Sequence, residues 1–136
     1  MSAVVIRELR PDDSIADITE LLHTAYAPLA AMGFKYLATH QDEATTRRRL
    51  QSGISIVAVL DGDIVGTVTL RAPQAESPCA WFSQPGVWSF GQFAVRPDLQ
   101  RNGMGQRLMH VIEQRALQHG AAELALDTAE GATHLV

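Results

Sequence analysis

Two glycines one residue apart, Gly103 and Gly105, mark a segment whose spacing could bind a phosphate group. An amphipathic pattern begins with them, which predicts that they lie at the start of a helix. The first N–H groups of a helix have no partner inside the helix and lie at the positive end of its dipole. Because glycine has no Cβ, a phosphate can approach these groups closely. Arg101 and Arg107 add positive charge, so we expect this segment to hold a pyrophosphate.

The elements that must position this segment are a strand before it and a helix that contains it. Residues 87–95 are apolar enough for a strand, and Arg96-Pro97-Asp98 lets the chain leave that strand and turn. The helix is expected over residues 103–118, with Gly120 well placed to end it. A last strand is expected over residues 123–128, and a strand–helix–strand unit of this kind predicts parallel strands joined by a right-handed crossover.

The earlier part of the chain predicts a strand, two helices and an antiparallel hairpin. The first helix follows the turn at Pro11 and presents one apolar face from Ile15 to Tyr26, and the pattern loosens from Pro28 to Asp42. Asp61-Gly62-Asp63 separates two β-branched runs, which is a strong hairpin signal. The expected ranges are 4–9 for the strand, 43–51 for the second helix, and 54–60 and 64–70 for the hairpin strands. The fold class is therefore α/β, with a mixed sheet.

Composition excludes several classes of protein. The chain has 136 residues, which suits one domain, and a formal net charge of −4 with no basic stripe, which argues against nucleic-acid binding. The cluster Arg47-Arg48-Arg49 is interpreted as a solvated helix face. No apolar run approaches the roughly 20 residues that span a bilayer, so we expect no membrane partner. Cys79 is the only cysteine, so no internal disulfide can form, and we expect a cytoplasmic protein. We expect no metal site.

The segment from Phe93 to Leu108 resembles the acetyl-CoA signature of the GNAT superfamily, Gln/Arg-x-x-Gly-x-Gly/Ala, together with its preceding strand. Residues 124–129 are similar to the family's fifth strand, and residues 61–66 to its central hairpin. The likeness covers most of the chain. It implies a GNAT-like mixed sheet with splayed parallel strands. It also implies an N-acetyltransferase that moves acetyl directly from acetyl-CoA to a primary amine of a small molecule or peptide.

The resemblance further implies roles for residues at the matching positions. The backbones of two residues on a bulged strand would bind the pantetheine arm, and main-chain N–H groups of the following loop would hold the pyrophosphate, with one asparagine side chain near the phosphates. These cofactor-binding residues are Phe93 and Val95 for the arm, Gln100, Arg101, Gly103, Gly105 and Gln106 for the pyrophosphate, and Asn102 beside it.

No general base can be assigned from the sequence. Some family members use a glutamate on the fourth strand, but the matching position here is about Ser89, which cannot act as a base, and neither can Gln92. Several other residues could lie near the cleft or the acceptor pocket, with packing or solvation as the favoured interpretation. They are Asp127, Glu130 and His134 near the cleft, and Tyr36, His40 and Asp42 near the acceptor.

Family members usually continue after the fifth strand with a tyrosine-bearing helix and two more strands, whereas this sequence stops at Val136. We therefore expect a single GNAT-like domain over residues 1–136 that is either a fragment or completed by a second copy in a homodimer. Two alternatives stay open. One is a non-catalytic acyl-CoA-binding or dimerising module. The other is a dinucleotide-binding domain, because Asp127 follows Gly105 at the spacing of a ribose-binding acid, although Leu108 takes the place of the third glycine.

Overall fold

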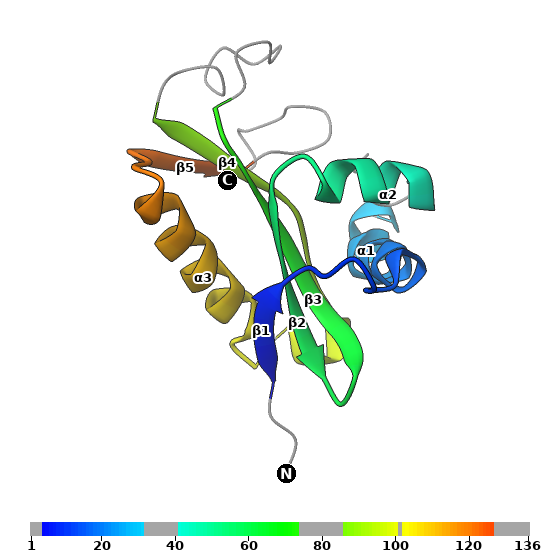
Figure 1. Cartoon of the computed structure of the whole chain (residues 1–136). Coiled ribbons are helices and arrows are strands. Elements are labelled where there is room, and N and C mark those ends of the chain that lie inside the picture. The colour runs from blue at the N-terminus through cyan, green and yellow to red at the C-terminus, as the bar shows by residue number, and fades with distance from the viewer. Residues whose placement is uncertain (1–3, 32–40, 74–85, 101, 127–136) are drawn as a thin grey trace.

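The computed structural model describes residues 4–31, 41–73, 86–100 and 102–126. These residues form one five-stranded sheet in which the strands lie in chain order, β1-β2-β3-β4-β5. Helix α3 covers one face of the sheet, and α1 and α2 cover the other (Figure 1). The strands are β1 (Val5–Glu8), β2 (Ile54–Leu60), β3 (Asp63–Arg71), β4 (Val87–Val95) and β5 (Glu123–Leu126), and the helices are α1 (Ile15–Ala31), α2 (Glu43–Leu50) and α3 (Met104–Gln118).

The sheet is mixed, as the sequence predicts. Strands β1 to β4 pair antiparallel, and β4 pairs parallel with β5 from Val87 opposite Glu123 to Phe90 opposite Leu126. The predicted hairpin is confirmed by the pairing of Leu60 with Asp63. Asp61 and Gly62, the two residues between them, have φ values of 53° and 83°. Positive φ at both central residues is the geometry that suits a two-residue hairpin loop.

Two cores lie on opposite faces of this sheet. The α3-side core joins buried residues of β2, β3 and β4 to one face of α3, including Met104, Leu108 and Ile112. The α1-side core joins Ile18 and Leu22 of α1 to residues of α2 and the sheet. Alternate residues of a strand point to opposite faces, so β4 contributes to both cores, with Val95 in the first and Ala94 in the second.

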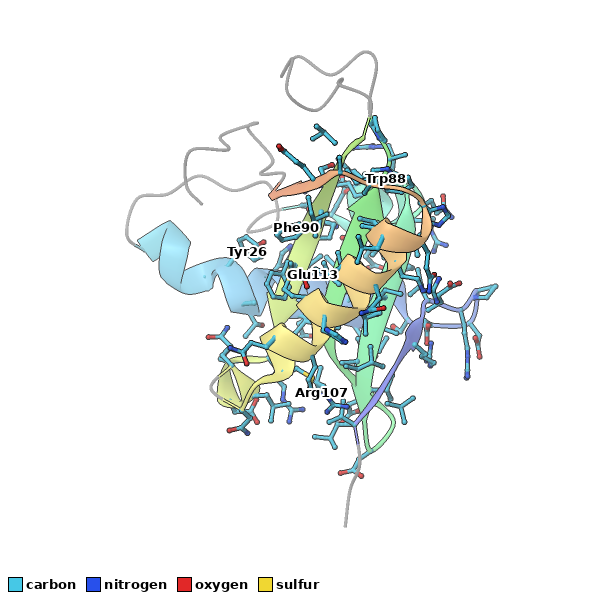
Figure 2. All side chains as sticks on the ribbon, turned by 90° about the vertical axis from the view of Figure 1, so that its left-hand side faces the viewer. Tyr26, Trp88, Phe90, Arg107 and Glu113 are labelled. Atoms are coloured by element: carbon cyan, nitrogen blue, oxygen red, sulfur yellow. The ribbon has the colours of Figure 1, made fainter. Side chains whose placement is uncertain are left out.

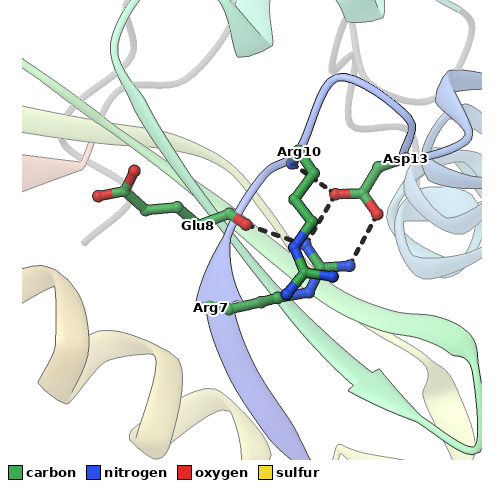
Figure 3. A network of polar contacts seen from close by, with 4 residues as sticks. All are labelled: Arg7, Glu8, Arg10 and Asp13. Atoms are coloured by element: carbon green, nitrogen blue, oxygen red, sulfur yellow. Dashed lines mark hydrogen bonds and ion pairs between the residues drawn. The ribbon is translucent and has the colours of Figure 1, made fainter.

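The connection from β1 to α1 is held by one ion pair. The Arg7 guanidinium donates to both carboxylate oxygens of Asp13, over 2.8 Å each, and the Arg10 backbone N–H donates to the same carboxylate (Figure 3). Ser14 then caps α1, since its Oγ accepts from the Asp17 backbone N–H at 3.1 Å. The two-pronged contact fixes the direction in which α1 leaves the sheet.

The first helix is longer than expected. The apolar pattern loosens at Pro28, but α1 continues to Ala31. Pro28 has no N–H to donate to the carbonyl of Thr24, four residues earlier. Because Thr24 is exposed, water can replace this hydrogen bond. No helix in the described part of the chain is long and apolar enough to cross a membrane.

Candidate active site

The loop between β4 and α3 is closed by its own hydrogen bonds. Residues Pro97–Leu99 form a 3₁₀ turn directly after the strand, and the Leu99 N–H donates to Arg96 O at 2.8 Å. The Gln100 side chain reaches back, with Nε2 donating to Val95 O at 3.1 Å. The Gln100 N–H itself donates to Pro97 O over a long 3.4 Å. The loop therefore returns the chain beside the end of β4, where α3 begins.

Helix α3 begins with unpaired amides. Gly103 is the N-cap, with φ 78°, a left-handed conformation that glycine adopts without strain. The Arg107 N–H donates to Gly103 O at 3.1 Å, which is the first bond of the helix. The N–H groups of Met104, Gly105 and Gln106 precede that bond and have no partner within the helix. No acidic residue lies in the first turn, so this end of α3 is suited to an anion.

Gly105 is in contact with β4. A Cβ at this position would lie 3.3 Å from Cζ of Phe93 and 4.0 Å from a methyl group of Val95. The absence of a side chain at Gly105 thus lets the first turn of α3 lie directly against Phe93 at the end of β4. Phosphate-bearing ligands need this kind of close backbone approach, so the residues present fit the cofactor that the resemblance implies.

Strand β4 carries a bulge at the point nearest to this helix. The register with β3 shifts between Thr67 and Thr69, so that Gln92 and Phe93 together oppose one residue, Val68. Gln92 has φ 53°, which is uncommon for a residue other than glycine. On α1, the Tyr26 hydroxyl donates to Phe93 O at 2.9 Å and ties this helix to the bulge. The backbone is therefore turned locally at the position where the resemblance implies binding of the pantetheine arm.

The aromatic residues of β4 pack towards α3. Trp88 stacks on His119 at the end of α3, with ring centroids 5.0 Å apart, and Phe90 meets Phe93 edge to face at 6.2 Å. Figure 2 shows Trp88 near the C-terminal end of α3 and Arg107 near its N-terminal end. Trp88, Phe90 and Phe93 all pack against the α3-side core.

Three buried side chains of β3 and β4 carry polar atoms without a hydrogen-bond partner in the described residues. They are Thr67 with its Oγ1, Ser89 with its Oγ, and Gln92 with both Oε1 and Nε2. Ser89 is 1% exposed and Gln92 is 3% exposed. Neither Ser89 nor Gln92 can act as a base, and the sequence indicates no other role for them. Burial without a hydrogen-bond partner has no signature in the sequence.

One candidate for the acceptor side, Asp42, is used to cap α2. Asp42 caps α2, where its carboxylate accepts from the Thr45 N–H at 2.8 Å, and this bond lowers the pKa of Asp42. Nε2 of His23 lies 2.6 Å from Gln41 O, a contact between α1 and the chain leading into α2. Other predicted residues lie outside the described part of the chain. These are Tyr36, His40, Cys79, Arg101, Asp127, Glu130 and His134.

A pocket of about 460 Å³ lies where α2 meets the end of β3. Its lining includes the cationic residues Arg48, Arg49 and Arg71 and no acidic residue of the described chain. Arg49 also donates to Gln41 Oε1 at 2.9 Å, and Arg71 to Ser52 Oγ at 2.9 Å. The interpretation of Arg47-Arg48-Arg49 as a solvated face is therefore incomplete, because Arg49 is half-buried and bonded.

The fold and the site together define an acyl-CoA-dependent transferase architecture, in which a bulged strand meets a glycine-rich helix start. The model of the acetyltransferase (GNAT) family matches residues 15–135, so the chain belongs to the GNAT acetyltransferase family. Acetyl-CoA is the cosubstrate of this family. The sequential, largely antiparallel order of the sheet is inconsistent with the parallel order of a dinucleotide-binding domain.

Two curated relatives come from Bacillus subtilis (strain 168). The chain is 31% identical to an S-(2-succino)cysteine N-acetyltransferase over 101 residues, which are 74% of this chain and 59% of the relative. It is 25% identical to an S-alkylcysteine N-acetyltransferase over 119 residues, which are 87% of this chain and 64% of that relative. The chain thus spans about three fifths of the length of these two proteins.

The fold is also shared with solved structures. A GNAT family acetyltransferase from Brucella melitensis, crystallised with acetyl-CoA, superimposes with a TM-score of 0.67 at 21% identity, over 92% of this chain and 75% of that one. This similarity confirms the GNAT-like mixed sheet that the sequence predicts.

Proposed function

We propose that this chain transfers acetyl from acetyl-CoA to the amine of a small acceptor, of the S-substituted cysteine class. The observation that carries the proposal is the meeting of the α3 start with the β4 bulge, where Gly105 lies directly against Phe93. The acceptor class is supported by the names of the two curated relatives, both of which are N-acetyltransferases of cysteine derivatives.

The cofactor would be held mainly by the backbone. The free N–H groups of Gly105 and Gln106, with that of Gly103, would bind the pyrophosphate, and Asn102 is exposed beside them. Gln100 stabilises the loop through Val95 O. Phe93 O accepts one bond from Tyr26, and because a carbonyl oxygen has two lone pairs it can accept a second from the pantetheine arm.

When bound, acetyl-CoA supplies an acetyl group activated as a thioester. The protein's task is to bring a neutral amine to that group, since a protonated amine has no free lone pair. Strand β4 has no titratable side chain at all between Val87 and Val95. Its contribution is therefore to position and hydrogen-bond the acceptor, and the proton must leave to water or to a group on another segment.

The test is a turnover assay with purified chain, acetyl-CoA and a panel of amines, in which released thiol is detected. The panel holds S-methylcysteine, S-(2-succino)cysteine, a polyamine, an aminoglycoside and a lysine peptide. We expect thiol release with the cysteine derivatives above all others. Coenzyme A binding without thiol release for any amine would instead support a non-catalytic acyl-CoA-binding module.

A further inference from the structure

Gln92 is buried and yet has no partner for either end of its amide. It is 3% exposed, and neither Oε1 nor Nε2 makes a hydrogen bond in the described part of the chain. Leaving buried donors and acceptors unpaired destabilises a fold, and the left-handed backbone of Gln92 adds strain. Two unfavourable features at one residue are typical of a position selected for binding rather than for folding.

A second buried glutamine shows that the fold can satisfy such a side chain. Gln41 is also 3% exposed, but its Nε2 donates to Thr46 Oγ1 at 2.8 Å and its Oε1 accepts from Arg49 at 2.9 Å. Both ends of that amide are paired. The unpaired state of Gln92 is therefore a local property of the β4 bulge.

Gln92 lies on β4 directly before Phe93, a residue of the proposed cofactor site. The next residue, Phe93, contacts the Gly105 position of the proposed cofactor site. Ser89 lies three residues before Gln92 on β4 and pairs with Arg71 of β3. Arg71 and Thr69 are two residues apart, so their side chains lie on the same face of β3. Thr69 Oγ1 lies 2.9 Å from Ser55 Oγ, which donates to Leu50 O in α2. Ser89 therefore faces the α1 and α2 side, whereas Gln92 and Phe93 share the position opposite Val68, a residue of the α3-side core.

We propose, on the basis of the acetyl transfer above, that Gln92 recognises the α-amino-acid head of the acceptor. A primary amide presents an acceptor and a donor side by side. Oε1 accepts from the N–H of the acceptor amine, and Nε2 donates to the neighbouring carboxylate. An amine without a neighbouring carboxylate leaves Nε2 unpaired, so Gln92 is a specificity-determining residue that selects α-amino acids.

The test compares two acceptors that differ only in the carboxylate, S-methylcysteine and 2-(methylthio)ethylamine. We expect the unmodified chain to favour S-methylcysteine in kcat/KM by about 10- to 100-fold, the range for one hydrogen bond to a charged group. Gln92→Met keeps the length of the side chain and removes the amide. Both acceptors then lose the bond to Oε1, and only S-methylcysteine also loses the bond to Nε2. Gln92→Met should therefore lower kcat/KM for S-methylcysteine much more than for the amine, chiefly through KM, so that the preference disappears.

Gln41→Met is the matched control. It should lower the melting temperature, because it breaks a paired amide, and should leave the preference between the two acceptors unchanged. Gln92→Met should melt at the same temperature as the unmodified chain or higher. The inference is overturned if Gln92→Met retains the full preference, or if it slows both acceptors equally.

A binding measurement separates this inference from the proposed function. Calorimetry on the protein saturated with coenzyme A, titrated with each of the two acceptors, reports the same preference without turnover. Thiol release absent for every amine would refute the proposed transfer, while a carboxylate preference in binding that Gln92→Met abolishes would still support the role of Gln92. Equal binding of both acceptors to the unmodified chain would refute that role.

Discussion

At the scale of single residues, the proposed cofactor site depends on two glycines for different physical reasons. Gly103 has φ 78° at the N-cap of α3 and open space where a Cβ would lie. Gly105 has ordinary helical surroundings but lies against the Phe93 ring. A side chain at the first position therefore strains the backbone, whereas one at the second collides with Phe93 and displaces the first turn of α3, whose N–H groups would hold the phosphate.

Valine at either glycine should weaken coenzyme A binding far more than loss of the Gln100 side chain. We expect Gly103→Val and Gly105→Val to raise the Kd by at least about tenfold, since a left-handed valine costs roughly 1–2 kcal/mol and a blocked amide loses a charge-assisted bond of about 1.5–3 kcal/mol. Gln100→Ala removes one part-buried hydrogen bond to Val95 O and should change the Kd by less than about fivefold. Isothermal titration calorimetry measures all three, and equal affinities would contradict the backbone cradle.

A second residue-scale prediction concerns acid stability. The Arg7 guanidinium holds the pKa of Asp13 below its ordinary value. Because the folded pKa is lower than the unfolded one, about 3.9, the ion pair stabilises the fold above that pH, and the contribution is lost as the pH falls through the lowered pKa. Asp13→Asn should destabilise the chain by about 1–3 kcal/mol at pH 7 and by less near pH 3.

Urea unfolding at both pH values measures this difference. Asp12→Asn is the control, because Asp12 is adjacent and exposed. Its unfolding curves should stay close to those of the unmodified chain at both pH values. An Asp13→Asn variant that loses as much stability at pH 3 as at pH 7 would show that the carboxylate charge is not what holds β1 to α1.

At the scale of elements, the contact between α3 and β3 depends on the absence of a side chain at Gly66. A Cβ there would lie 2.9 Å from Cδ1 of Leu108 and 3.3 Å from Cβ of Ala58. Leu108 is fully buried in the α3-side core, so the helix rests on the sheet at this point. The spacing between α3 and the sheet also sets where the helix start lies relative to the bulge.

The coupling of these two residues can be measured by a double-mutant cycle. Gly66→Ala should destabilise the fold by about 1–3 kcal/mol through overpacking, and Leu108→Ala by about 2–5 kcal/mol through a cavity. In the double variant the new methyl group enters the space that the leucine leaves. We therefore expect the combined loss to be smaller than the sum, by about 0.5–3 kcal/mol, in chemical denaturation. Strict additivity would mean that α3 shifts away from β3 instead.

The elements themselves could largely be predicted from the sequence, because periodicity and turn chemistry are local signals. Asp61-Gly62 predicts the hairpin, and the bounds of β4 match the expected strand. The bulge at Gln92 could be expected only through the family resemblance. Its unpaired amide could not be predicted at all, since it depends on what β3 and α1 place around it. The bond from Tyr26 to Phe93 O joins residues far apart in the chain and has no local signal either.

At the scale of the whole molecule, ligand binding should raise the melting temperature. A ligand at one hundred times its Kd stabilises the folded state by about 2.7 kcal/mol, which for a domain of this size raises the melting temperature by roughly 5–10 °C. We expect that shift with coenzyme A. NAD at the same concentration should produce none, because the sheet lacks the parallel order of a dinucleotide site. A shift with NAD alone would contradict the assignment of the α3 start to coenzyme A.

The division of the molecule into two cores on opposite faces of one sheet has a consequence for engineering. Helix α3 and the Phe93 side of β4, which carry the proposed cofactor contacts, belong to one core, whereas α1, α2 and Ala94 belong to the other. Randomised libraries confined to the second core should therefore leave the residues that contact the acyl donor, and with them its affinity, unchanged.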